Sequence, residues 1–312
     1  MFVPCEVGGC WSCAVEVDRE VRPSCVTAVR DGMKINTSIP EDYVPRRIVH
    51  GWMGHAVGGV GTPWWLKGHE AIEVACFAAG CNLRCPQCQN WTTTYRGRGK
   101  TLTPGESALL MAEARKRYRV NRMAISGGES TLNRSWLVQY LKELKKLNPD
   151  KEARLHVDTN ATILTRDYID ELIEAGMTDI GPDLKGLYPE TFMRITGIED
   201  KGLAERYQET AWKATEYIIN NYREKVFIGI GIPYNKKFIS IQEIVEMGKR
   251  IAKIDPTVQV CVLDYRPEFR AMNITKPSSE DMFLVWKELK ETGLKTVICQ
   301  TDFGHIGPGE KK

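Results

Sequence analysis

The chain has 312 residues, a formal net charge of +3 and a hydrophobic content of 42%, which are ordinary values for a globular protein. Its 43 basic residues are mixed with 40 acidic ones, so the sequence lacks the basic footprint of a dedicated nucleic-acid-binding protein. The longest apolar runs fall short of the ~20 residues that cross a bilayer, and the N-terminus does not resemble a signal peptide. We therefore expect a cytoplasmic protein that binds neither nucleic acid nor membrane.

Four cysteines near the N-terminus follow the spacing C-x4-C-x2-C plus one more. They are Cys5, Cys10, Cys13 and Cys25. Plant-type 2Fe-2S ferredoxins use this spacing, and zinc is the alternative because closely spaced cysteines also bind zinc. Clustered cysteines in a large chain without a signal peptide favour metal clusters over disulfides. We predict a 2Fe-2S cluster in a ferredoxin-like segment at residues 1–44.

The segments 10–17 (CWSCAVEV) and 25–33 (CVTAVRDGM) resemble the 2Fe-2S domains of NADH dehydrogenase large subunits and iron-only hydrogenases. In those domains a strand hairpin and a helix precede the first cysteine, whereas only four residues do so here. We therefore expect an incomplete domain. Truncation is the favoured explanation, and elements supplied by a partner are the alternative.

After a Pro- and Gly-rich connector at residues 45–70, short apolar strands alternate with amphipathic helices. This alternation is the βαβ signature of a parallel sheet. The expected strands are 71–77, 122–126, 154–158, 178–183, 226–232, 258–263 and 295–299. The fold class that follows is α/β: a partial (β/α)6 barrel of the TIM type at residues 71–306, with a flexible tail at 307–312.

Helix signals support these units. The stretches 103–106 (TPGE) and 240–243 (SIQE) both fit the capping box, in which the first and fourth residues exchange hydrogen bonds. The helix at 134–147 carries an apolar stripe at three- and four-residue steps, which predicts a core-facing side. That stripe consists of Leu137, Tyr140, Leu141, Leu144 and Leu147.

Three further cysteines, Cys81, Cys85 and Cys88, follow the first expected barrel strand with the spacing C-x3-C-x2-C. A four-iron cluster normally takes four thiolates, so three leave one iron open for a ligand. Zinc is again the alternative, but a structural zinc site needs four ligands and no fourth Cys or His lies nearby downstream. We predict a 4Fe-4S cluster on these three residues.

The cysteine spacing, followed by 126–129 (SGGE) after the next strand, resembles the radical S-adenosylmethionine (SAM) family over residues 71–306. The resemblance implies that the open iron binds SAM and that one electron cleaves SAM to methionine and a 5'-deoxyadenosyl radical. That radical would abstract hydrogen from a substrate. No catalytic residue is assigned beyond the cluster.

Polar residues end four successive strands, where the chemistry of such barrels lies. The stretches 158–160 (DTN) and 183–185 (DLK) resemble motifs of pyruvate formate-lyase activating enzymes. Strand-end caps and turns are the plainer interpretation of the first stretch. Ala161 and the stretch 263–266 (LDYR) depart from the activating-enzyme pattern, and two alternatives follow: Arg266 takes over the contact, or the contact is lost. The resemblance thus implies SAM contacts from Gly127, Gly128, Glu129, Asp158, Thr159, Asn160, Asp183, Lys185 and Arg266.

Glycyl-radical-enzyme activation is the function that this resemblance implies. The partners would be a ferredoxin or flavodoxin as electron donor and a glycyl-radical enzyme as substrate, with the N-terminal segment relaying electrons. One alternative is the modification of a small molecule or peptide, because 85–91 (CPQCQNW) also resembles the AmmeMemoRadiSam group. The other is a non-catalytic protein that carries two clusters for electron transfer.

Overall fold

The computed structural model describes residues 3–66, 68 and 70–309, and its centre is one sheet of ten strands. Seven neighbouring strands are parallel and confirm a mixed α/β fold built on a parallel sheet. They are β5 (Glu73–Ala78), β7 (Arg122–Gly127), β8 (Arg154–Thr159), β9 (Asp179–Pro182), β10 (Phe227–Tyr234), β11 (Gln259–Asp264) and β12 (Thr296–Thr301). All seven were expected from the sequence. The strand order β13-β12-β11-β10-β9-β8-β7-β5-β4-β6 is linear, so the barrel is open.

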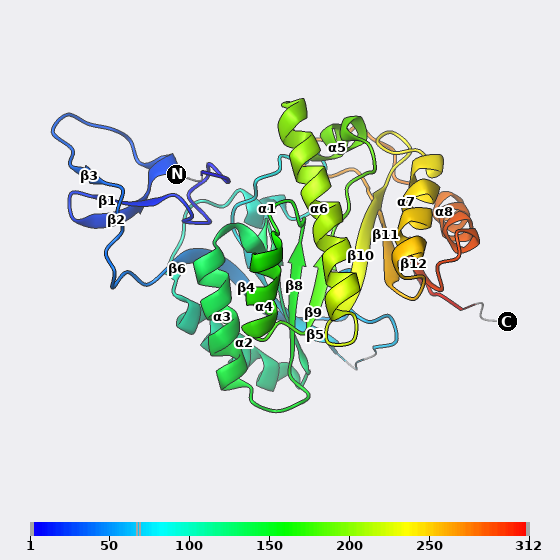
Figure 1. Cartoon of the computed structure of the whole chain (residues 1–312), viewed down its shortest axis with the longest axis horizontal. Helices are drawn as coiled ribbons and strands as arrows, with labels where there is room; N and C mark the ends of the chain where they lie inside the picture. Colours follow the sequence, from blue (N-terminus) through cyan, green and yellow to red (C-terminus); the bar gives the residue numbers. More distant parts are fainter. Residues whose placement is uncertain (1–2, 67, 69, 310–312) are drawn as a thin grey trace.

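Helices lie between the parallel strands and cover the outer side of the sheet (Figure 1). They are α1 (Trp91–Thr94), α2 (Pro104–Tyr118), α3 (Arg134–Leu147), α4 (Arg166–Glu174), α5 (Pro189–Thr196), α6 (Lys201–Tyr222), α7 (Ile241–Ile254) and α8 (Ser279–Glu291). One continuous apolar core joins their inner faces to the strands. None of the helices described is long and apolar enough to span a bilayer.

Two of the helix predictions need correction. Thr103 and Glu106 form the reciprocal capping box that was expected at α2. At α7, Ser240 accepts a hydrogen bond from the backbone N–H of Glu243, but the Glu243 carboxylate accepts from Leu187, Tyr188 and Thr191 instead of closing the box. In α3, the predicted stripe is buried except for Leu147, which is 39% exposed because the helix ends there.

The expected connector, residues 45–70, contains a strand that the sequence analysis did not predict. β4 (Arg47–His55) pairs antiparallel with β5 and also with the short β6 (Thr101–Leu102). Its first residues are buried, and a register shift between Gly51 and Met53 interrupts the pairing. The glycines at this irregularity masked the alternation by which strands are recognised.

A small N-terminal lobe, residues 3–44, carries its own three-stranded sheet beside the barrel (Figure 1). Its strands are β1 (Ala14–Val17), β2 (Glu20–Pro23) and β3 (Ile35–Asn36), with β1 in the middle. The other end of the chain adds a strand that the sequence analysis did not predict. β13 (Gly304–Ile306), inside the range expected for the barrel, pairs antiparallel with β12, and residues 310–312 of the expected tail lie outside the described residues.

Candidate active site

A cavity of about 990 Å³ lies at the C-terminal ends of the parallel strands. It is lined by all three cysteines of the loop after β5 and by polar residues from the ends of β7, β8 and β9. Of the residues expected to contact SAM, these line it: Gly127, Gly128, Asp158, Thr159, Asn160, Asp183 and Lys185. Glu129 and Arg266 are not among the lining residues.

The cysteine loop, residues 81–88, rests on a small apolar cluster around Leu83 and Phe192. Burial raises the pKa of Cys81 and of Cys88, and raises that of Cys85 to about 11 although nearby Lys185 acts in the opposite direction. Without a metal these thiols are therefore protonated at neutral pH. A metal cation bound by these sulfurs would deprotonate them and stabilise the thiolates.

Two N–H donors face the sulfur of Cys81. The backbone N–H of Leu83 lies 3.4 Å from it, and Nδ2 of Asn160 lies 3.7 Å from it. Hydrogen bonds to sulfur tune the potential of iron-sulfur clusters. Asn160 thus joins the end of β8 directly to the cysteine loop.

Gly127 and Gly128 pack against the backbone that leads into the cysteine loop. A Cβ on Gly128 would lie 2.2 Å from the carbonyl oxygen of Gly80, and one on Gly127 would lie 2.5 Å from the nitrogen of Ala78. Gly127 also has a φ of 112°, which favours glycine. The pair forms a half-buried stretch of backbone on the cavity wall, where the resemblance implies a contact with SAM.

Glu129 does not face the cavity. Its carboxylate is buried and accepts hydrogen bonds from Thr131, from the Thr159 hydroxyl and from the backbone N–H of Asn160. With these donors in place, Glu129 positions the two β8 residues that do line the cavity. A direct contact between Glu129 and SAM stays a prediction.

Asp183 and Lys185 face the cavity beside a tyrosine. Nζ of Lys185 lies 3.0 Å from Oδ2 of Asp183 and 3.3 Å from the hydroxyl of Tyr265. Burial opposes a charge on Lys185, but Asp183 and Tyr265 prevail and raise its pKa well above the usual value. Arg266 lies 3.2 Å from the carboxylate of the buried Asp264 and is not among the cavity-lining residues, whereas Tyr265 is.

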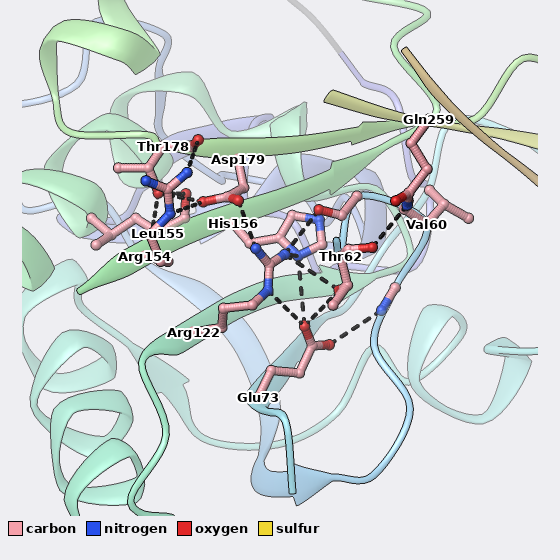
Figure 2. Close-up of polar contacts among 12 residues, drawn as sticks. Val60, Thr62, Glu73, Arg122, Arg154, Leu155, His156, Thr178, Asp179 and Gln259 are labelled. Carbon is pink, nitrogen blue, oxygen red and sulfur yellow. Dashed lines mark hydrogen bonds and ion pairs between the residues drawn. The ribbon is translucent and has the colours of Figure 1, made fainter. Parts of the chain in front are cut away.

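A buried charge network lies deeper in the barrel (Figure 2). Arg122 contacts Glu73 at 3.3 Å, Asp179 at 2.6 Å and Nδ1 of His156 at 2.6 Å. Nε2 of His156 lies 2.9 Å from the Asp158 carboxylate at the cavity wall. Burial and Arg122 favour a neutral imidazole, but Asp158 and Glu73 outweigh them and raise the pKa of His156 to about 9.

The network holds an inner segment, residues 58–62, inside the barrel. Gln259 donates to the carbonyls of Val60 and Thr62, and Arg122 donates to the carbonyl of Gly61. A Cβ on Gly61 would lie 2.6 Å from Nε2 of His156. The segment lines the cavity together with the C-terminal residues 305–309. The sequence analysis did not assign either segment to the cavity wall. Charged and amide residues at the starts of apolar strands, such as Glu73 and Gln259, were the available signal, because they indicate a polar barrel interior.

The four N-terminal cysteines also come together. Sγ of Cys10 lies 3.2 Å from Sγ of Cys5, which lowers the pKa of Cys5 and raises that of Cys10. Burial, with Cys13 and Cys5 nearby, raises the pKa of Cys25 to about 12. Among the described residues no three such side chains are placed to hold a single metal ion. Two-iron clusters spread four thiolates over two irons, and a grouped set of four suits that chemistry.

Several known proteins are similar to this chain. A probable GTP 3',8-cyclase of Methanococcus aeolicus is 31% identical over 117 residues, which are 38% of this chain and 38% of that protein. A protein of the same name from Thermococcus kodakarensis is 25% identical over 234 residues, 72% of this chain and 70% of that one. The chain thus spans well under half of the first of these relatives.

Solved structures share the fold. Streptococcus suis SuiB bound to S-adenosylmethionine superposes with a TM-score of 0.52 at 17% identity, over 68% of this chain and 44% of SuiB. The hydrogenase maturase HydG from Carboxydothermus hydrogenoformans gives 0.50 at 15% identity, over 69% and 49%. The model of the radical SAM superfamily matches residues 76–248, more than half of the chain and all three cysteines of the loop. The protein therefore belongs to the radical SAM superfamily.

Proposed function

We propose that the protein cleaves SAM reductively and uses the resulting radical to abstract hydrogen from a substrate in the same cavity. The carrying observation is that the Cys81, Cys85 and Cys88 thiols share one cavity with the ends of three further strands. In this superfamily a 4Fe-4S cluster on three cysteines supplies the open iron that binds SAM and the electron that cleaves it.

The residues around the loop suit SAM, which carries an ammonium, a sulfonium and a carboxylate. Lys185 supplies a positive charge and Asp183 a negative one, and Gly127 and Gly128 bring backbone without side chains to the cavity wall. Gln87 adds an acceptor: its Nε2 donates to the carbonyl of Ile195, while its buried Oε1 has no partner among the described residues. A ligand with an N–H group would satisfy this oxygen.

We propose that the N-terminal lobe holds a 2Fe-2S cluster that passes electrons to the barrel. Its support is the convergence of Cys5, Cys10, Cys13 and Cys25 on the side of the cysteine loop. The partner on this proposal is a ferredoxin or flavodoxin. Plant-type clusters lie near about −400 mV, which is low enough for this purpose.

For the substrate, the resemblance of 158–160 and 183–185 to activating enzymes supports a backbone glycine of a glycyl-radical enzyme. A second candidate is a compact ligand, in line with the nucleotide cyclase names of the relatives. The inner segment and residues 305–309 support it because they line the same cavity as the cysteines and narrow the space for a substrate. Cavities of ~300–1,000 Å³ usually hold small molecules.

The test is SAM cleavage by anaerobically reconstituted protein. Wild type reduced with dithionite should release 5'-deoxyadenosine and methionine. Serine at Cys81, Cys85 or Cys88 should abolish release. The control is Cys76→Ser, which should retain it: Cys76 is a buried thiol of β5 that lies beside Tyr140 of α3. Loaded protein that binds SAM but never cleaves it would overturn the proposal. Once cleavage is established, a glycyl-radical signal on a candidate partner would support the activating function. Conversion of GTP would support a small-molecule substrate.

A further inference from the structure

The N-terminal cysteines are built onto the chain that leads into the cysteine loop. Gly80, directly before Cys81, has a φ of 87°, and a Cβ there would lie 2.8 Å from Cβ of Cys5 and 3.1 Å from its sulfur. A Cβ on Gly9 would lie 2.8 Å from Cβ of Ala79. The two cysteine sets therefore share one wall, residues 79–80.

Hydrogen bonds fix this contact from the barrel side. The N–H of Ile48 in β4 donates to the carbonyl of Gly9 at 3.0 Å. Nδ2 of Asn133 donates to the carbonyl of Cys10 at 2.9 Å, and Nη2 of Arg84 donates to that of Cys5 at 3.2 Å. The cysteine-bearing end of the lobe is thus held at three points.

Arg47 lies at the centre of this wall and is fully buried. Its guanidinium donates to the carbonyls of Ala79, Glu129 and Ser130, while its Nε has no partner among the described residues. Two of these acceptors belong to the 126–130 loop on the SAM side. The guanidinium therefore holds the backbone from which Glu129 positions Thr159 and Asn160.

This buried charge lacks an ion pair. Among the described residues no carboxylate forms an ion pair with the guanidinium, whose partners are the three carbonyls. The N-terminal cysteines lie next to this part of the chain, because Ile48 donates to the carbonyl of Gly9 and Nδ2 of Asn133 donates to the carbonyls of both Cys10 and Arg46. Glu129 is already shared among donors from Thr131, Thr159 and Asn160. An isolated buried charge is costly, so a counter-charge is needed.

We propose that Arg47 couples the two cysteine sites, as the counter-charge of a cluster on the N-terminal cysteines and as the support of the SAM-side loop. This inference rests on the proposed 2Fe-2S cluster. A cluster with four thiolates carries net negative charge, and one-electron reduction by an external donor makes it more negative. A fixed guanidinium beside it stabilises the reduced form and raises the reduction potential.

The experiment compares full-length Arg47→Gln and Arg47→Lys with wild type. Iron and sulfide per chain are counted first. The potential of the 2Fe-2S signal is then titrated by electron paramagnetic resonance, and SAM affinity is measured. Arg47→Gln should shift the potential downward and weaken SAM binding, while Arg47→Lys should retain more of both. Arg223→Gln, which removes an exposed partner of Asp255, should change neither.

A second variant serves if Arg47→Gln does not fold. Asn133→Asp preserves the acceptor that caps α3 but loses the donor to Cys10 and adds negative charge, so it should also lower the potential. An intact cluster with unchanged potential in both variants overturns the coupling role. Wild-type protein whose N-terminal site holds no iron overturns the proposed relay and this inference with it, whereas a normal wild-type cluster that ignores Arg47 overturns the inference alone.

Discussion

Nε2 of His156 lies 2.9 Å from Oδ1 of Asp158, so a fully buried imidazole stands directly behind a carboxylate of the cavity wall. This pair joins the cavity to the network around Arg122, in which Figure 2 shows His156 beside Arg122. The charge state of a residue far from solvent thus acts on the ligand-facing surface.

The first prediction concerns pH and stability. The pKa of His156 is raised to about 9 in the folded protein, above its unfolded value of ~6.5. The stabilisation that protonated His156 adds to the free energy of unfolding is therefore fully present below pH ~6.5 and is lost as the pH rises through 9. In urea unfolding, the free energy of unfolding of the wild-type protein should decline over this pH window. The His156→Gln variant should not show this decline. His305→Gln should keep the decline, because burial lowers the pKa of His305; equal slopes in all three proteins would contradict the assignment.

The second prediction concerns SAM affinity. Lys185→Met leaves Asp183 and Tyr265 without their cation, and truncating one partner of a buried charge pair costs ~2–5 kcal/mol. Calorimetric titration of reconstituted protein should show SAM binding weakened ~30-fold or more, with unchanged iron content. Lys201→Met, at an exposed pair with Glu190, is the control. Equal affinity in both variants would make Lys185 purely structural.

The third prediction tests the inner segment. Gly61→Ala places a Cβ 2.6 Å from His156 and 2.7 Å from Gly181, and overpacking of this kind costs ~1–3 kcal/mol. Chemical denaturation should report that loss. Gly105→Ala in α2 meets nothing within 4 Å and should not destabilise the protein. Wild-type stability of Gly61→Ala would mean that the segment can leave the barrel interior.

The fourth prediction separates two reductants. Cys10→Ser removes a ligand of the proposed relay but leaves the Cys81 loop intact. Cleavage of SAM with dithionite, a small reductant that reaches the barrel directly, should survive. Cleavage driven by a ferredoxin or flavodoxin system should fall. Parallel losses with both reductants would indicate that the lobe only supports the barrel structurally.

The sequence was sufficient for the parallel strands and for the cysteine loop because these depend on local signals. Apolar runs bounded by turns marked the strands from β5 to β12, and the spacing of Cys81, Cys85 and Cys88 is itself the motif. Polar residues at successive strand ends were correctly expected to share one cavity, because parallel strands place their ends at one edge.

What the sequence could not show depends on long-range packing. Glu129 and Arg266 are both polar and both follow strands, yet one braces Thr159 and the other pairs with Asp264. Which way each points is decided by neighbours distant in sequence. The buried position of Arg47 was equally hidden, since an arginine at the start of a glycine-rich stretch is more often exposed.

Two parts of the cavity wall, the inner segment and residues 305–309, lie outside the part of the chain that matches the superfamily, residues 76–248. Under the proposed function, the shared part forms the radical and the unshared parts shape the space in which a substrate binds. A homologue that resembles this chain only across the shared part is therefore expected to share its radical chemistry but not its substrate specificity. Proteins that also keep the glycine-rich segment pinned by Gln259 and the C-terminal hairpin are the ones expected to act on the same molecule.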